Sequence, residues 1–316
     1  MRFKRRQIYI LLLPINFMNE KSETPHQAGF VNIIGLPNAG KSTLMNALLG
    51  EKLSIVTPRA QTTRHRVFGI LNGENYQIVY GDTPGVLDPK YKLQEGMMKS
   101  VGTALKDADL VMMVIDSADP TPFHPETLNR VKKLKVPLFI VLNKYDLVGN
   151  EGVNRLFEFW NAELPKAKIF PVSATEKIHT RELLVHILKE LPECPPYFPK
   201  DEISDRSMRF FVSEIIREKL LLNYDKEIPY ACEVVIESFK EEADIVKIMA
   251  LIMVERESQK RIIIGHQGNA IKRMGTQARK DMEAFLGKKV FLETLVKVEE
   301  NWRSDARKLK MFGYLD

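Results

Sequence analysis

The chain contains the stretch Gly35-Leu36-Pro37-Asn38-Ala39-Gly40-Lys41-Ser42, which follows the pattern G-x-x-x-x-G-K-S. An apolar run of strand length, residues 30–34, precedes it, and residues 43–50 follow it with helix-like apolar spacing and a closing glycine. A phosphate-binding loop requires this order of strand, loop and helix, because the loop N–H groups and the helix N-terminus then face an anion. We therefore predict a phosphate-binding loop over residues 35–42.

Three positions in this loop carry separate parts of the chemistry. Gly40 lets the backbone approach the phosphates, Lys41 brings a positive charge toward the β- and γ-phosphates, and the Ser42 hydroxyl can ligate Mg²⁺. A chance match in a glycine-containing loop is the alternative, and the flanking strand and helix argue against it.

Length and composition indicate an ordinary globular protein of about two domains. The 316 residues are 44% hydrophobic and 28% charged, which is typical of such proteins. The two cysteines, Cys194 and Cys232, make neither a metal-binding spacing nor a disulfide framework, so they favour a reducing compartment. The formal net charge is +6, but residues 1–17 hold four basic residues and no acid. Global charge is therefore weak support for nucleic-acid binding.

Residues 1–27 are predicted to be a leader outside the folded domains. A basic start and a short apolar run resemble a signal peptide, but the run is too short to span a bilayer and Pro14 interrupts it. We expect translation to start at Met18, and a weak membrane-surface anchor is the alternative.

Two folded domains are expected, joined by a proline-rich linker over residues 192–205. Residues 28–191 are predicted to form an α/β domain, a mixed and mostly parallel sheet with helices on both faces. Its expected strands are 30–34, 67–71, 76–80, 110–115, 138–142 and 169–172, with helices at 89–106, 125–134, 151–163 and 180–190. Residues 206–316 are predicted to form a small α+β domain. Its expected helices are 210–222, 258–264 and 269–286, with strands at 231–239, 245–254 and 290–298.

Two polar motifs follow predicted strands of the first domain. In Asp82-Thr83-Pro84-Gly85, the acid can hold a Mg²⁺-bound water and the Gly85 N–H can contact a γ-phosphate. In Asn143-Lys144-Tyr145-Asp146, a carboxylate can accept two hydrogen bonds from guanine that adenine does not offer in that arrangement. Ser173-Ala174 follows the last strand and suits a tight loop whose N–H groups meet the guanine carbonyl oxygen. Each motif alone can be an ordinary turn.

Residues 57–66 are polar and lack apolar periodicity, so we predict an exposed loop. A threonine hydroxyl in such a loop can ligate Mg²⁺ only while a γ-phosphate holds the loop in place. The residues alone leave the choice between Thr62 and Thr63 open.

The second domain contains Gly265-His266-Gln267-Gly268 between two predicted helices. Residues 256–280 around it hold seven Lys or Arg residues and one acid. A glycine loop lets the backbone clamp phosphates closely, and Ile262, Ile263 and Ile264 offer an apolar floor for unstacked bases. An ordinary helix–turn–helix with a solvated basic face is the alternative.

The ordered set of G-x-x-x-x-G-K-S, D-T-P-G, N-K-x-D and S-A resembles that of translation-factor-type GTPases. The loop at 57–66 and the segment Asn301-Trp302-Arg303-Ser304-Asp305 resemble the Era family of bacterial ribosome-assembly GTPases, and the resemblance spans residues 29–314. It implies the catalytic residues Lys41, Thr63 and Gly85, and the magnesium ligands Ser42, Thr63 and, through water, Asp82. It also implies GTP contacts from Gly35, Leu36, Pro37, Asn38, Ala39, Gly40, Lys41, Ser42, Asp82, Thr83, Pro84, Gly85, Val86, Asn143, Lys144, Tyr145, Asp146, Ser173 and Ala174.

Two positions bear on the hydrolysis reaction. Val86 stands where Ras-like GTPases carry a water-orienting glutamine, so we expect slow intrinsic hydrolysis. Asn38 resembles the loop asparagine with which some relatives bind K⁺, which makes K⁺ a second candidate cofactor beside Mg²⁺.

The second domain resembles a KH domain of the bacterial, type II form, which binds about four nucleotides of single-stranded RNA. The resemblance implies RNA contacts from Ile262, Ile263, Ile264, Gly265, His266, Gln267, Gly268, Lys272, Arg273, Arg279 and Lys280. The family usually has lysine or another small or basic residue inside the G-x-x-G, so His266-Gln267 puts one backbone charge contact in doubt.

The resemblance implies a monomeric, cytoplasmic switch that hydrolyses GTP to GDP, binds small-subunit ribosomal RNA near its 3′ end and assists maturation of the small ribosomal subunit. The alternative is a signalling GTPase at the inner face of the plasma membrane, whose second domain binds protein or lipid. A third interpretation, a P-loop kinase, conflicts with the N-K-x-D motif and the lack of a second substrate site.

Overall fold

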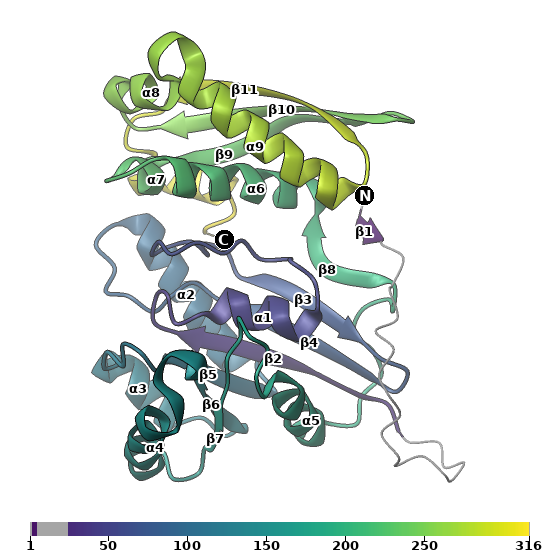
Figure 1. Ribbon diagram of the computed structural model, residues 1–316, viewed down its shortest axis with the longest axis vertical. Coiled ribbons are helices and arrows are strands. Elements are labelled where there is room, and N and C mark those ends of the chain that lie inside the picture. The colour runs from purple at the N-terminus through teal and green to yellow at the C-terminus, as the bar shows by residue number, and fades with distance from the viewer. Residues whose placement is uncertain (1, 5–24, 316) are drawn as a thin grey trace. The chain divides into compact units, whose positions relative to one another are not determined.

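We describe residues 2–4 and 25–315 of a computed structural model (Figure 1). The prediction of a leader falls mainly on residues outside this part of the chain. The described residues form two compact units. Unit 1 comprises residues up to Lys52, Arg66–Thr83 and Gly102–Asp205, and unit 2 comprises Leu53–His65, Pro84–Val101 and the residues from Arg206 onward. Within the described ranges, no helix combines the length and the apolar character needed to cross a bilayer.

Unit 1 is built on a six-stranded sheet in the order β3-β4-β2-β5-β6-β7. The strands are β2 (Gln27–Gly35), β3 (Val67–Asn72), β4 (Tyr76–Asp82), β5 (Leu110–Asp116), β6 (Leu138–Asn143) and β7 (Lys168–Pro171). Among the described strand pairs of this sheet, only the β3–β4 hairpin is antiparallel, as the Asn72-Gly73 turn predicts. The central strands are buried on both faces, so their sequences are continuous apolar runs.

The helices that follow these strands are α1 (Lys41–Leu49), α3 (Pro125–Lys132), α4 (Tyr145–Glu163) and α5 (Thr180–Glu190). The helix expected at 151–163 therefore begins earlier, at Tyr145, and Gly149 interrupts its regular geometry with φ 60° and ψ −166°. Glycine adopts this backbone conformation without a side-chain clash.

The predicted linker contains a strand that the sequence pattern does not reveal. Strand β8 (Glu202–Ser207) pairs with the short strand β1 (Arg2–Lys4). Its buried positions, Glu202 and Ser204, are polar, so the apolar alternation that predicts strands is missing. Upstream, the Gln77 side chain accepts hydrogen bonds from the Tyr197 and Phe198 N–H groups at 2.7 and 2.9 Å. The segment is thus held against the β3–β4 hairpin.

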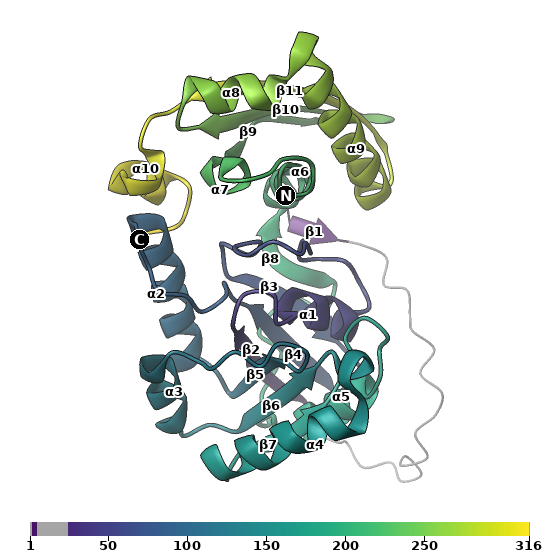
Figure 2. The ribbon, with the colours of Figure 1, turned by 60° about the vertical axis from the view of Figure 1, so that its left-hand side comes forward.

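Unit 2 contains a three-stranded sheet in the order β11-β10-β9, from β9 (Glu233–Glu241), β10 (Ile245–Val254) and β11 (Lys289–Val298) (Figure 2). β10 runs parallel to β11 and antiparallel to β9. The helices α6 (Met208–Asn223), α8 (Glu257–Ile264) and α9 (Asn269–Leu286) supply apolar side chains to its core. The predicted order of helices and strands in this region is confirmed, and the short helices α7 (Ile228–Ala231) and α10 (Ala306–Met311) are additional.

A second apolar cluster in unit 2 joins the C-terminal segment to the start of α2 (Lys92–Lys106). Its buried members are Leu93, Met97, Trp302, Leu309 and Tyr314. The Trp302 indole N–H donates to the Ala231 carbonyl at 2.9 Å, which satisfies its one polar atom inside the cluster.

Candidate functional site

The predicted phosphate-binding loop connects the end of β2 to the first turn of α1. Asn38 and Gly40 have φ angles of 64° and 91°, so the loop turns through the left-handed region twice before α1 begins. A Cβ at Gly40 would lie 2.2 Å from the Asn143 side-chain nitrogen. Only glycine therefore fits at this position, for a reason of packing as well as of backbone conformation.

Lys41 is almost fully buried at the start of α1. Its ammonium group donates to the Leu36 carbonyl at 2.8 Å, across the loop. Burial lowers the pKa of Lys41 to about 8, and the Asp82 carboxylate opposes that shift. A poorly solvated ammonium group at the N-terminus of a helix is well suited to bind an anion.

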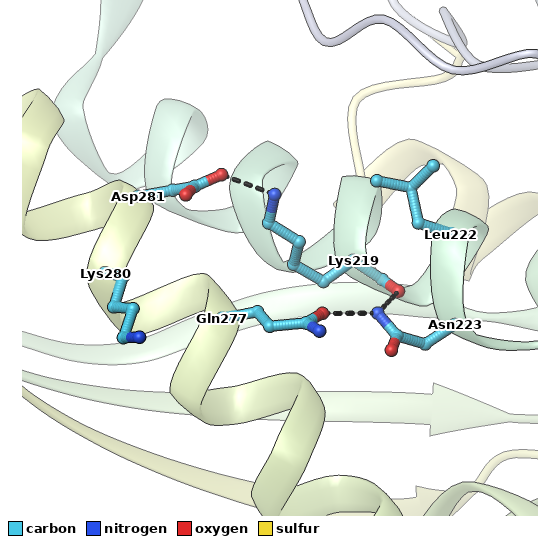
Figure 3. A pocket seen from close by; sticks show the side chains of 6 residues that line it. All are labelled: Lys219, Leu222, Asn223, Gln277, Lys280 and Asp281. Atoms are coloured by element: carbon cyan, nitrogen blue, oxygen red, sulfur yellow. Dashed lines mark hydrogen bonds and ion pairs between the residues drawn. The ribbon is translucent and has the colours of Figure 1, made fainter.

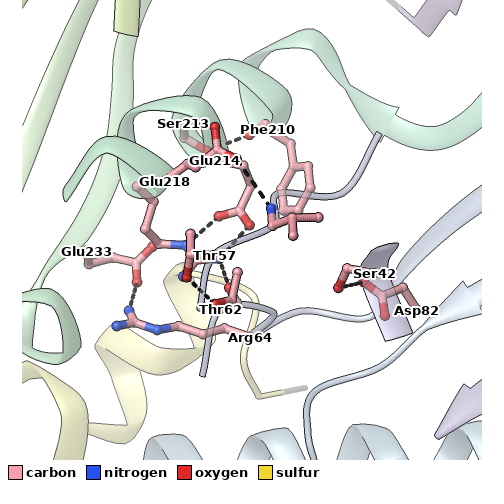
Figure 4. Close-up of polar contacts among 12 residues, drawn as sticks. Ser42, Thr57, Thr62, Arg64, Asp82, Phe210, Ser213, Glu214, Glu218 and Glu233 are labelled. Carbon is pink, nitrogen blue, oxygen red and sulfur yellow. Dashed lines mark hydrogen bonds and ion pairs between the residues drawn. The ribbon is translucent and has the colours of Figure 1, made fainter. Parts of the chain in front are cut away.

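Ser42 and Asp82 form a contact that fits a magnesium site (Figure 4). The Ser42 hydroxyl donates to the Asp82 carboxylate at 2.7 Å. Asp82 ends β4 and is fully buried, and the next residue, Thr83, donates from its hydroxyl to the Ile33 carbonyl at 2.7 Å. A hydroxyl and a carboxylate are oxygen ligands of the kind that Mg²⁺ prefers.

Asn143 connects the phosphate-binding loop to two further predicted motifs. Its side-chain N–H donates to the Ala39 carbonyl at 2.9 Å, and its side-chain oxygen accepts from the Ala174 N–H at 3.0 Å. Both bonds are buried. The segments predicted to bind phosphate and base are therefore held together by one amide side chain.

The rest of the predicted base site follows β6 and β7. Lys144 adopts a left-handed conformation with φ 63°, and its ammonium group contacts the Asp116 carboxylate at 2.5 Å. Asp146 is exposed in the first turn of α4. Asp116, which ends β5, was not identified from the sequence, although an acid at the end of a parallel strand is a signal that could have found it.

Four predicted nucleotide-site residues, Thr63 and the run Pro84-Gly85-Val86, belong to unit 2. Val86 is buried with 4% exposure, so its apolar side chain packs within the protein. Thr63 lies in a loop whose neighbouring residues are fixed to α6 and to the start of β9. Arg64 is 1% exposed, and its guanidinium group forms an ion pair with Glu233 at 3.3 Å (Figure 4).

The G-x-x-G loop has a backbone that requires its glycines. Gly265 and Gly268 have φ angles of 71° and 76°, and a Cβ at Gly265 would lie 2.6 Å from the Ala270 Cβ. His266 and Gln267 are exposed between them. α9 starts directly after Gly268, so its N-terminal N–H groups open at the loop.

The structure corrects one part of the predicted apolar floor. Ile262 is 52% exposed, but Ile263 is fully buried in the core of unit 2, and Ile264 is half-buried. Three consecutive residues of α8 point in different directions because a helix turns by about 100° per residue. Only Ile262 and Ile264 of this set reach the surface.

The predicted basic residues of α9 differ in their surroundings. Lys272 and Arg273 are exposed in the first turns, next to the G-x-x-G loop. Arg279 forms an ion pair with Glu283 at 2.8 Å, and Lys280 lines a groove between α6 and α9 (Figure 3). The predicted basic residues near the G-x-x-G loop are therefore exposed, whereas Arg279, farther along α9, already pairs with an acid.

Comparison with known families identifies both halves of the chain. The family model described as the 50S ribosome-binding GTPase matches residues 30–144, and the KH domain model matches residues 227–303. GTPase Era of Leuconostoc citreum is 42% identical over 93% of this chain and 98% of its own length. GTPase Era of Syntrophus aciditrophicus is 43% identical over 91% of this chain and 95% of its own length.

Two solved structures are similar over 92% of this chain and 100% of their own chains, each with a TM-score of 0.87. One is a crystal structure of Era in complex with MgGDPNP and nucleotides 1506–1542 of 16S ribosomal RNA, at 38% identity. The other is a point variant of Aquifex aeolicus Era bound to GDP·AlF4⁻, at 36% identity. Because relatives named GTPase Era are 42–43% identical over more than nine-tenths of this chain, and the GTPase and KH models match its two halves, this chain belongs to the Era family of GTPases.

Proposed function

We propose that this GTPase binds small-subunit ribosomal RNA near its 3′ end and assists maturation of the small ribosomal subunit. One observation carries the RNA part of the proposal: two glycines in the left-handed region flank exposed His266 and Gln267 at the N-terminus of α9. Such a loop lets the RNA backbone come close to N–H groups, and exposed Lys272 and Arg273 supply positive charge beside it.

The proposed ligand follows from the loop and from a relative. A KH groove holds about four unpaired nucleotides, which favours a single-stranded segment over a duplex. Exposed Ile262 and half-buried Ile264 are the proposed floor, and the other proposed contacts are Gly265, Gly268, Arg279 and Lys280. The Era crystal structure with nucleotides 1506–1542 of 16S ribosomal RNA supports ribosomal RNA as the choice.

For the nucleotide site, we propose that the residues predicted from the four GTPase motifs bind GTP, with Lys41, Thr63 and Gly85 as the catalytic residues. Ser42, Thr63 and, through water, Asp82 are the proposed residues that hold Mg²⁺, which neutralises charge on the phosphates when bound. The hydrogen bond between Ser42 and buried Asp82 supports this assignment, since both groups are hard oxygen donors.

Intrinsic hydrolysis is proposed to be slow because Val86 is apolar and buried and cannot orient water. K⁺ is proposed as a second cofactor at Asn38, which is exposed in the loop with φ 64°. Equal turnover in K⁺ and Na⁺ buffers would exclude the K⁺ part.

Crosslinking of bound RNA in the presence of a GTP analogue, followed by sequencing, tests the proposed function. We expect recovery of unpaired small-subunit ribosomal RNA near its 3′ end, and less recovery with GDP. Gly268→Asn is the matched control for the backbone strain that any side chain meets at φ 76°, and Gly268→Asp is the informative variant, because it also places a carboxylate in the loop. It should abolish recovery and leave GDP affinity unchanged.

The competing interpretation makes a different prediction for the same protein. A membrane-surface GTPase would give no enriched ribosomal RNA and would bind vesicles of anionic lipid in a manner that Gly268→Asp does not affect. We place this protein in the cytoplasm as a monomer, and light scattering with sedimentation from cell extracts would check both statements.

A further inference from the structure

The loop that carries Thr63 is bound to the rest of unit 2 on both sides of that threonine. Before it, the Arg217 guanidinium group of α6 donates a hydrogen bond to the Thr62 carbonyl. After it, Arg64 donates to three main-chain carbonyls within residues 229–232, at 2.7 to 3.2 Å. The main chain around Thr63 is therefore fixed by two arginine side chains.

Both arginines are buried and each has a carboxylate partner. Arg217 is 1% exposed and binds the two oxygens of Glu214 through Nε and Nη2, each at 2.6 Å. Arg64 pairs with Glu233, which is itself buried. Removing one member of a buried ion pair leaves an unpaired charge, so these contacts are costly to break. These buried contacts therefore order the loop.

Further contacts attach the same loop along α6. The Arg59 guanidinium donates to the Leu221 carbonyl at 2.6 Å, and the Val56 N–H donates to Glu218 at 3.3 Å. All four of these residues belong to unit 2. This unit thus supplies part of the order that a loop must have before it can offer a threonine to a phosphate-bound metal.

The other side of α6 contacts the helix that follows the G-x-x-G loop (Figure 3). Lys219 forms an ion pair with Asp281, and the Asn223 side chain donates to Gln277 at 2.7 Å. One helix therefore contacts both the threonine loop and α9.

We infer that Arg217 is a positioning residue for GTP hydrolysis: from the first helix of the RNA-binding region, it orders the main chain beside Thr63. This inference rests on the proposed role of Thr63. A loop that is already ordered loses less conformational entropy when a γ-phosphate engages it, so its contacts with α6 favour GTP over GDP.

The decisive measurement compares the affinities of Arg217→Ala for GDP and for a non-hydrolysable GTP analogue. We expect affinity for the analogue to fall roughly 5- to 150-fold, the usual range of coupling between sites, while affinity for GDP stays within about twofold. GDP has no γ-phosphate to engage the loop, so a loss of loop order should leave the affinity for GDP unchanged. A merely structural defect would instead weaken the binding of both nucleotides. The value of kcat should fall with the analogue affinity.

Two variants make the test independent of misfolding. Arg217→Lys keeps the charge and one donor, so it should recover part of the lost preference for the analogue. Asn223→Ala is the matched control, because it removes a hydrogen bond on the opposite side of the same helix and should leave the ratio of the two affinities unchanged.

Thr63→Ala separates this inference from the function on which it rests. If Thr63→Ala leaves analogue affinity unchanged, the role of Thr63 fails and this inference fails with it. If Thr63→Ala weakens the analogue and Arg217→Ala does not, only the role of Arg217 is overturned. A rise in analogue affinity for Arg217→Ala, or an equal loss for both nucleotides in the alanine and lysine variants, would also overturn it.

Discussion

Asn143→Ala tests whether one amide side chain holds together the segments that are predicted to bind the nucleotide. The change removes the donor to the Ala39 carbonyl and the acceptor of the Ala174 N–H, and both groups are buried. A buried polar group left without a partner costs about 1–3 kcal/mol, so losing both bonds should lower the free energy of unfolding of unit 1 by about 2–6 kcal/mol. GDP affinity should fall as well, because the loops predicted to bind phosphate and base lose their common connection.

Urea unfolding followed by tryptophan fluorescence measures this change. The chain has two tryptophans, and Trp160, which is 5% exposed in α4, reports on unit 1 when the other is replaced in a Trp302→Phe background. Asn150→Ala is the matched control. Asn150 lies on α4, the helix that carries Trp160, and accepts one exposed hydrogen bond from the Tyr145 hydroxyl at 2.8 Å. Its replacement should change the free energy of unfolding by no more than about 0.5 kcal/mol.

Asn143→Asp divides the effect between the two bonds. It keeps the acceptor for Ala174 and removes the donor to Ala39, where a carboxylate oxygen would then face a carbonyl oxygen. An Asn143→Ala variant that loses less than about 1 kcal/mol, or no more than Asn150→Ala, would refute the reasoning that these two bonds are buried and unreplaced by water.

Three further outcomes are expected. Burial lowers the pKa of Lys41 to about 8. GDP binding, which restores the charged form, should therefore take up about half a proton at pH 8 and about a tenth at pH 7. Calorimetry in buffers of different ionisation heat measures this uptake, and equal uptake at the two pH values would contradict the prediction. Burial lowers the pKa of His65 to about 3. The unfolded chain therefore binds a proton first as pH falls through 6.5, and stability declines, by about 1 kcal/mol at pH 5 for a half-buried ring. His65→Gln should lose that much less between pH 7.5 and 5 in thermal melts. Gly265→Ala, with its Cβ 2.6 Å from Ala270, should destabilise unit 2 by about 1–3 kcal/mol. Gly275→Ala in open space should be neutral or stabilising, and similar melting temperatures for both would count against the strained-loop interpretation.

The sequence allowed the strand ends that carry the predicted nucleotide-site motifs to be located, because these motifs follow apolar runs in a recognisable order. The strand ends at Gly35, Asp82 and Asn143 meet at one edge of the sheet, as expected for parallel strands. What the pattern could not show is which groups Asn143 bridges, the Ala39 carbonyl and the Ala174 N–H, since the partners of an amide group depend on loops that are remote in sequence.

The contacts of the threonine loop were hidden for a different reason. An arginine in a polar segment is usually solvated, so Arg64 gives no sign in the sequence that it is buried. Arg217 and Glu214 likewise resemble an ordinary surface pair on a helix. The error at Ile263 arose because three consecutive isoleucines were treated as one surface, whereas a helix divides them between core and solvent.

The burial of Arg64 has a consequence for how this protein can be taken apart. Residues 206–316 look like an interchangeable module in linear sequence, but a fragment that begins at Arg206 would retain buried Glu233 and lose the arginine that pairs with it. Transplanting this RNA-binding region onto an unrelated protein would therefore require Leu53–His65 to travel with it. A simple end-to-end fusion of residues 206–316 to another protein is therefore disfavoured, because unit 2 also contains Leu53–His65, which lies in the N-terminal half of the sequence.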